Sequence, residues 1–363
     1  MHRERTMERK LKFAQYGCGT TASILLKYMI NKGAEPVAII DRNAGRRGKL
    51  IEEVWPECGA QGLRITPPED AAALLRETKP DICIIATRST MNDIMEPFEN
   101  CAKAGVSAIT IAEEAVYPYN SSPEKAAYLD RLAKEAGVVF SASGFTDTYW
   151  GSLVTTLAGS LNMVEEIEGY CLYSAYAETL AAYHGVGLTV EEFEEQFGTY
   201  NRMSPEKQQQ LVLEGKFEPI SMWNQNGWLC SKMGLTAVSQ KQICQYETRE
   251  DAVYSTELHR EFEPGLVTGS RFTAVTETAE VITIKGSCAA RVFTPEDREY
   301  TSWSIKGEPD VSMRFDMKDA NYQTCSNLIN RIPAVLNSSP GFVTSDKFEN
   351  CTYMTDHIGS YVK

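Results

Sequence analysis

The chain has 363 residues, of which 43% are hydrophobic and 23% are charged, which excludes a disordered, collagen-like or disulfide-dense secreted protein. Single hydrophobic cores rarely grow beyond about 250–300 residues, so two domains are expected. The chain carries 36 basic and 49 acidic residues, and its net charge of −13 disfavours nucleic acid as a partner because the phosphate backbone is also negative.

The sequence offers no signal for a membrane or for export. No run of about 18 apolar residues exists, so no membrane partner is expected. Residues 1–10 are mostly charged and lead into a predicted strand without an apolar signal core, and Met7 is a second candidate start. We therefore expect a cytoplasmic protein.

Cysteine and histidine spacing gives no support for a metal site. The ten cysteines include no C-x-x-C pair, and the four histidines show no H-x-x-x-H spacing. Several cysteines lie in apolar runs, such as Cys83 within Ile82–Ile85. This pattern is typical of buried, reduced thiols.

In chain order, strands and helices alternate through the first part of the sequence. The expected strands are Leu11–Tyr16, Pro36–Asp41, Ile82–Thr87, Ser107–Ala112 and Val138–Ala142. The expected helices are Thr20–Lys32, which Gly33 closes, and a segment from Ser122 to Gly137 with a proline in its first turn. The alternation predicts βαβ units and an α/β fold, a doubly wound parallel Rossmann sheet.

The pattern changes after Gly144. Further helices are expected at Thr148–Leu161, Thr189–Phe197, Ser204–Glu214 and Tyr322–Leu336, and strands between Ala252 and Met317 at Arg271–Thr276, Val281–Ile284 and Asp310–Phe315. The sequence thus predicts a dinucleotide-binding domain of residues 1–145, completed by residues 321–363. Residues 146–320 are expected to form an α+β domain with a mostly antiparallel sheet for substrate binding and oligomerisation. Its exposed sheet faces favour a homodimer.

The segment Gly17–Ala22 has the pattern G-x-G-x-x-A between a predicted strand and a predicted helix, the context that a dinucleotide site needs. Gly17 permits a tight turn, Gly19 allows close approach of a pyrophosphate, and Ala22 lets the helix pack on the strand. The start of the helix, with Thr20 and Thr21, offers N–H groups to phosphates. An ordinary strand–turn–helix connection is the alternative.

Asp41 ends the second strand, where a carboxylate binds the ribose of NAD. Arg42, Arg46 and Arg47 follow, and arginines at this place accommodate the 2′-phosphate of NADP, although a solvated loop explains them equally well. The cofactor is therefore NAD or NADP, with a slight preference for NADP. Thr87, at the end of another strand, is a further expected cofactor contact.

Glu113 and Glu114 follow a predicted parallel strand, at the edge of an open α/β sheet where ligands bind. Beside a nicotinamide, a carboxylate can hold a cationic amine and can act as a general base. The alternative is an acidic first turn of a helix.

At these residues the sequence resembles the 2,4-diaminopentanoate dehydrogenases and related NAD(P)-dependent amine dehydrogenases, which have a dihydrodipicolinate-reductase-like N-terminal domain. The resemblance also rests on Lys79–Asp81, Tyr117–Pro118, Leu132–Val138, Gly187–Phe193, Ile305–Pro309, Asn330–Val335 and Ser339–Gly341. It implies that a glutamate of the pair is catalytic, without showing which one.

One segment departs from that family. Where the family has an asparagine–proline–glycine turn after the last Rossmann strand, this chain has Phe145, Thr146 and Asp147, which puts the substrate in doubt. Asp147 is a candidate for binding a substrate cation or, alternatively, a helix cap. Tyr173, Tyr176 and His184 are candidates for substrate contact, although alternating aromatic residues more often belong to a strand core. We expect Trp223 and Trp228 to lie in a loop.

The resemblance implies an oxidoreductase that catalyses the reversible oxidative deamination of a primary amine or diamino acid. Two alternatives stay open: a C–OH or cyclic-imine reductase of the same fold, and a non-catalytic NAD(P)-binding sensor. The absence of a lysine at positions 113 and 114 argues against alcohol chemistry of the kind that sugar dehydrogenases perform.

Overall fold

The computed structural model describes residues 10–316 and 319–363. Met7, and Met317 at the end of the predicted β-rich segment, lie outside the described residues. The described residues form two compact units: unit 1 comprises residues 10–148 and 319–363, and unit 2 comprises residues 149–316. The boundaries expected from the sequence, 145/146 and 320/321, lie a few residues away from these.

Unit 1 contains a parallel sheet with the strand order β15-β6-β5-β4-β1-β2-β3. Its strands are β1 (Lys12–Tyr16), β2 (Glu35–Ile40), β3 (Ile65–Thr66), β4 (Ile82–Ile85), β5 (Ser107–Thr110), β6 (Val139–Ala142) and β15 (Gly341–Val343). The central strand β4 is buried along its whole length, as expected where helices cover both faces of a parallel sheet. The predicted Rossmann fold is confirmed.

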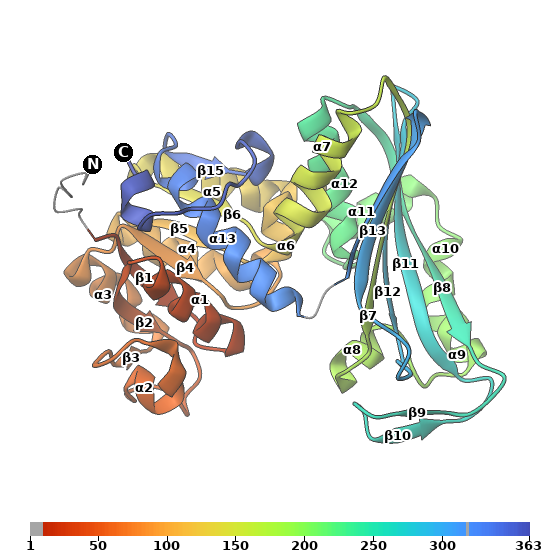
Figure 1. Ribbon diagram of the computed structural model, residues 1–363, viewed down its shortest axis with the longest axis horizontal. Helices are drawn as coiled ribbons and strands as arrows, with labels where there is room; N and C mark the ends of the chain where they lie inside the picture. The colour runs from red at the N-terminus through yellow and green to blue at the C-terminus, as the bar shows by residue number, and fades with distance from the viewer. Residues whose placement is uncertain (1–9, 317–318) are drawn as a thin grey trace. The chain divides into compact units, whose positions relative to one another are not determined.

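Helices pack on both faces of this sheet (Figure 1). The helices of unit 1 are α1 (Thr20–Asn31), α2 (Ile51–Val54), α3 (Ala71–Thr78), α4 (Met91–Ala104), α5 (Pro123–Ala136), α6 (Phe145–Asp147) and α13 (Ala320–Leu336). Of these, α1, α3, α4, α5 and α13 contact strands of the sheet. Helix α13 packs beside α1, while α3, α4 and α5 pack in a row. The late helix therefore completes the first unit, and its residues Leu328 and Ile332 are buried in the core of that unit.

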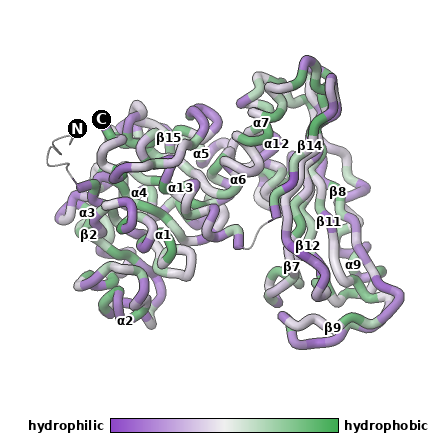
Figure 2. Tube along the Cα trace, viewed as in Figure 1, coloured by the Kyte–Doolittle hydropathy of each residue, from purple (hydrophilic) through white to green (hydrophobic). Residues whose placement is uncertain are grey.

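Unit 2 is built on a mixed sheet with the order β14-β13-β7-β12-β11-β8, in which the pair β7–β12 is parallel and the other pairs are antiparallel. Its strands are β7 (Met163–Ser174), β8 (Ala237–Thr248), β11 (Val267–Thr278), β12 (Thr283–Arg291), β13 (Tyr300–Glu308) and β14 (Val311–Asp316). A separate hairpin consists of β9 (Val253–Ser255) and β10 (Arg260–Phe262). Burial alternates along much of β8, β13 and β14, and Figure 2 shows both hydrophobic and hydrophilic segments on the strands of this unit. The expected mostly antiparallel sheet is confirmed.

The helices of unit 2 pack mainly against β8, β11 and β12. They are α7 (Leu153–Ala158), α8 (Glu178–Tyr183), α9 (Val190–Phe193), α10 (Thr199–Asn201), α11 (Pro205–Leu213) and α12 (Ser221–Met233). The helix expected at Thr148–Leu161 is shorter, because a π-helical turn, Thr148–Ser152, precedes α7. Val281 and Ile282 were expected in a strand but lie in the turn before β12, where Val281 has a φ of 63°.

The expectation of a loop around Trp223 and Trp228 is wrong. Both indoles are fully buried on α12. The polar residues between them resemble a loop in sequence, but their amides satisfy buried backbone groups: Gln225 donates to the Trp150 carbonyl oxygen at 2.9 Å, and Asn226 donates to the Ala274 carbonyl oxygen at 3.0 Å. Buried hydrogen bonding thus accounts for the polarity of this helix.

Candidate active site

The glycine-rich loop leaves β1 with the geometry that its two glycines predict. Gly17 has a φ of 94°, and a Cβ atom there would lie 2.1 Å from the carbonyl oxygen of Ala86, at the end of β4. A Cβ atom on Gly19 would meet no heavy atom within 4 Å. The first glycine is therefore required by the fold, whereas the second borders open space, as a phosphate site needs.

Gly19 also precedes the first residue of α1. No side chain caps this helix end, and its first turn carries no acidic residue. Thr20 is exposed, Thr21 is partly exposed, and Ala22 is buried in the core. The first N–H groups of α1 are therefore available to an anionic group.

The peptide groups of Cys18 hold the loop in place. The Cys18 N–H donates to Asp41 Oδ2 at 2.5 Å, and the Cys18 carbonyl oxygen accepts from Arg46 Nη1 at 2.7 Å and from Trp55 Nε1 at 3.0 Å. The other Asp41 oxygen accepts from the Asn43 N–H at 2.6 Å. Both oxygens of Asp41 thus bind backbone. Sequence reasoning did not identify Trp55, which no motif marks.

A pocket of about 240 Å³ opens at this loop. Its lining brings together most of the expected cofactor residues: Gly17, Gly19, Asp41, Arg42, Arg46 and Thr87. Arg42 is exposed, while Asp41 is 5% exposed. Burial raises the pKa of the Cys18 thiol to about 11, so Cys18 is protonated and is no nucleophile near neutral pH. The loop, the open helix end and the pocket fit a dinucleotide.

The paired glutamates lie in a 3-10 turn, Glu113–Val116, just beyond β5. Glu114 Oε2 accepts from the N–H of Met91, the first residue of α4, at 2.6 Å. Its Oε1 accepts from the hydroxyl groups of Ser121 and Ser122, both at 2.7 Å, directly before α5. The Glu114 carboxylate therefore joins the beginnings of two helices to the end of β5.

The Glu113 side chain is exposed, although its neighbour is partly buried. Both residues follow a strand that pairs in parallel with β4 and with β6, at the carboxyl edge of the sheet. Glu113 is therefore the more exposed glutamate of the pair at the edge where ligands bind in such sheets. The structure separates two residues that the sequence could not distinguish.

Asp147 is neither an exposed cation site nor a helix cap. Its side chain is fully buried in unit 1, where it accepts from Arg331 Nε at 2.9 Å, from Arg331 Nη2 at 3.0 Å and from the Ser143 hydroxyl at 2.6 Å. The expected contact with a substrate cation is corrected accordingly, because a buried guanidinium already binds both of its oxygens.

The remaining candidates, Tyr173, Tyr176 and His184, belong to unit 2. His184 is fully buried: its Nε2 lies 2.9 Å from the Tyr173 hydroxyl and its Nδ1 lies 2.8 Å from the Ser270 hydroxyl. Burial lowers the pKa of His184 to about 4, so the ring is neutral. These contacts make His184 part of the core, whereas Tyr176 is 59% exposed.

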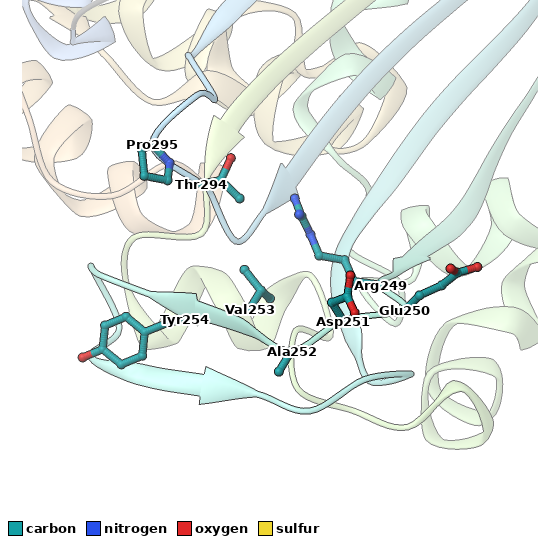
Figure 3. A pocket seen from close by; sticks show the side chains of 8 residues that line it. All are labelled: Arg249, Glu250, Asp251, Ala252, Val253, Tyr254, Thr294 and Pro295. Carbon is teal, nitrogen blue, oxygen red and sulfur yellow. The ribbon is translucent and has the colours of Figure 1, made fainter.

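A second pocket, of about 470 Å³, lies in unit 2 beside the β9–β10 hairpin (Figure 3). Its lining includes Arg249, Glu250, Asp251 and Tyr254, and it contains none of the expected site residues. Within the described residues, no group of three or more His, Cys, Asp or Glu side chains could hold a metal ion. In the same part of the chain, every helix is too short or too polar to cross a membrane.

Comparison with known proteins adds a family context to this geometry. No family model matches the chain. The chain is 26% identical to the 2,4-diaminopentanoate dehydrogenase of Acetoanaerobium sticklandii over 179 residues, which cover 48% of this chain and 49% of that protein, about half of its length. A solved amine dehydrogenase from Mycobacterium smegmatis is 29% identical, with a TM-score of 0.80 over 96% of this chain and 98% of the other. The predicted resemblance to the amine dehydrogenases is confirmed.

Both of these amine dehydrogenase relatives are named dehydrogenases, which supports the expectation of an NAD(P)-dependent enzyme. A UDP-N-acetylglucosamine 3-dehydrogenase from Acidithiobacillus ferrooxidans is 12% identical, with a TM-score of 0.49 over 97% of this chain and 95% of the other. At that level of similarity nothing about substrate follows.

Proposed function

We propose that the protein is an NAD(P)-dependent amine dehydrogenase that deaminates a primary amine or a diamino acid to the ketone and ammonia, reversibly. The observation that supports this most directly is the division between the two glutamates. Glu114 binds the starts of α4 and α5, and Glu113 is the more exposed of the two at the same sheet edge as the glycine loop. A carboxylate at that edge suits a substrate that is cationic when it arrives.

The dinucleotide would be held by the glycine loop, the start of α1 and the pocket beside Asp41 and Arg42. We propose NADP as the preferred form. Both Asp41 oxygens already accept backbone hydrogen bonds, which weakens their use for a ribose hydroxyl. The exposed Arg42 guanidinium is a suitable partner for a 2′-phosphate. A bound nicotinamide would supply the hydride acceptor.

Glu113 would perform the proton transfers. An ammonium group has a pKa of about 10 and must lose its proton before the C–H bond can give up hydride. The Glu113 carboxylate would accept that proton. Because Glu113 is exposed, it would release that proton to solvent and become a carboxylate again. After the substrate iminium has formed, the carboxylate would take a proton from the attacking water and return it to the nitrogen of the carbinolamine, which would collapse to ketone and ammonia. Its negative charge would also stabilise the developing iminium.

The substrate class follows the name of the curated relative, a 2,4-diaminopentanoate dehydrogenase. We propose a diamino acid of that kind or a simple primary amine. We also propose a homodimer, which would bury the sheet face of unit 2 that carries Glu166, Lys285 and Lys306 in ion pairs. Sedimentation velocity at micromolar concentration distinguishes a dimer from a monomer.

The test of the reaction is a panel of diamino acids, simple amines, alcohols and cyclic imines, assayed with NAD and with NADP in both directions. Turnover of an amine with release of ammonia supports the proposal. Turnover confined to alcohols or cyclic imines would replace it with the corresponding reductase. Binding of NADPH in a fluorescence titration, with no turnover of any compound, would favour a sensor.

A further inference from the structure

The turn after β6 is held by α13 through buried polar contacts that the proposed chemistry does not use. Arg331 is 2% exposed, and its guanidinium binds both oxygens of the fully buried Asp147. Arg331 Nη1 also donates to the Glu349 carbonyl oxygen at 2.5 Å. On the same helix, Asn327 Nδ2 donates to the Gly144 carbonyl oxygen at 3.2 Å. The segment Ser143–Asp147 is therefore fixed to α13 at both ends.

The turn after β6 lies directly beside the 3-10 turn Glu113–Val116. Ala142, the last residue of β6, pairs with Thr110, the last residue of β5, and the Ser143 N–H donates to the Thr110 carbonyl oxygen at 3.0 Å. The short helix α6 and the 3-10 turn Glu113–Val116 are in contact. A shift of the β6 turn would therefore disturb the surroundings of Glu113.

A buried ion pair is a costly way to join two elements if stability is its purpose. Desolvation of the two charges offsets most of their attraction, and well-packed apolar side chains of similar size are often at least as stabilising. A bidentate arginine–carboxylate pair, however, fixes distance and direction, which apolar contact does not. We therefore attribute the Arg331–Asp147 pair to a need to fix the position of the turn after β6.

We propose that Arg331 and Asp147 are positioning residues, which set the β6 turn against the Glu113 turn and so place the substrate carbon relative to the Glu113 carboxylate. This role rests on the proposed function. Neither residue touches the reacting atoms, since both are buried in unit 1. The pair acts through Ser143–Asp147, the segment in which this chain departs from the family turn.

The decisive variant replaces both charges at once, Asp147→Leu with Arg331→Met. Removing one partner would leave a buried charge and would strongly destabilise unit 1, whereas the double change leaves no buried charge and is expected to fold. We expect kcat/KM for the amine to fall by about 10- to 100-fold, since small misplacement of reacting groups costs rates of that order. The Kd for NADPH should stay unchanged. Lys134→Met, which removes the exposed Asp130–Lys134 pair on α5, is the matched control.

A second readout does not depend on turnover. Amide hydrogen exchange of the peptides that cover residues 111–116 and 143–148 should be faster in the double variant, with the glycine-loop peptide unchanged. Wild-type amine kinetics together with wild-type exchange in a folded double variant would overturn the positioning role. If the wild-type protein turns over no amine, the proposed function fails, and unchanged exchange at both turns would still overturn the coupling between them.

Discussion

The glycine-rich loop after β1 and the turn after β6 lie at the same edge of one parallel sheet, yet different contacts hold them. The loop is constrained by its own backbone, since Gly17 adopts a φ that disfavours side chains and a Cβ atom would strike the end of β4. The turn after β6 is held by Arg331, which is 184 residues away in the chain from Asp147. A constraint within a short segment can be recognised from a local sequence motif, whereas an ion pair between distant residues cannot.

The largest expected effect is a loss of NADPH binding, and it should distinguish Gly19 from Gly17. Gly19→Val should abolish NADPH binding with little change in Tm, because the new side chain enters open space that the pyrophosphate needs. Gly17→Ala should lower both binding and Tm, because its Cβ atom meets backbone that cannot move aside. Fluorescence titration and thermal unfolding measure the two effects. Unchanged NADPH affinity in Gly19→Val would remove the loop from the cofactor site.

The next largest effect is on kcat, and it should differ between Glu113 and Glu114. Glu113→Gln should lower kcat by about 100-fold or more, the contribution of a general base, with NADPH affinity kept. Its pH–rate profile should also lose the limb that belongs to the coupled carboxylate–ammonium pair. Glu135→Gln on α5 is a control that makes the same charge change on an exposed residue of unit 1.

Glu114→Gln should behave differently, with a lower Tm and a milder loss of kcat, since its carboxylate binds the starts of α4 and α5. Each lost charged hydrogen bond is worth about 1.5–3 kcal/mol. If Glu113→Gln keeps more than about a third of wild-type kcat, a loss too small for a general base, the proposed role of Glu113 is wrong.

The two glycines and the two glutamates show what can be predicted from the sequence and what cannot. The Rossmann fold, the glycine loop and the sheet edge with Glu113 follow from periodicity and from a short motif. The roles of Glu114 and Asp147 do not, because Ser121, Ser122 and Arg331 carry no motif that joins them to these carboxylates. The helix α12 was missed for the same reason: its amides resemble a loop until their buried partners are known.

A smaller effect is expected for cofactor choice. Arg42→Ala should lower the ratio of kcat/KM for NADP over NAD by about 10-fold, since a charged hydrogen bond to the 2′-phosphate is worth about 1.5–3 kcal/mol. Arg46→Ala should instead weaken both cofactors, because Arg46 binds the Cys18 carbonyl oxygen of the loop. Arg131→Ala, an exposed arginine on α5, is the control. An unchanged ratio in Arg42→Ala would exclude it from the adenosine site.

The smallest effect concerns His184, which the aromatic pattern made a candidate for substrate contact and which the structure buries. Its pKa is about 4 in the folded chain, lowered by burial, against about 6.5 when unfolded. Between these values the unfolded chain binds a proton that the folded chain does not, so stability is complete above pH ~6.5 and falls as the pH drops toward 4. The slope is at most about 1.4 kcal/mol per pH unit.

Thermal unfolding of His184→Gln should therefore be less sensitive to pH between 7 and 5 than that of the wild type. The control is His259→Gln, which changes an exposed histidine of the same unit and should match the wild type. Equal pH sensitivity in all three would show that the fold does not lower the pKa of His184, and the ring would again be a candidate for contact with substrate.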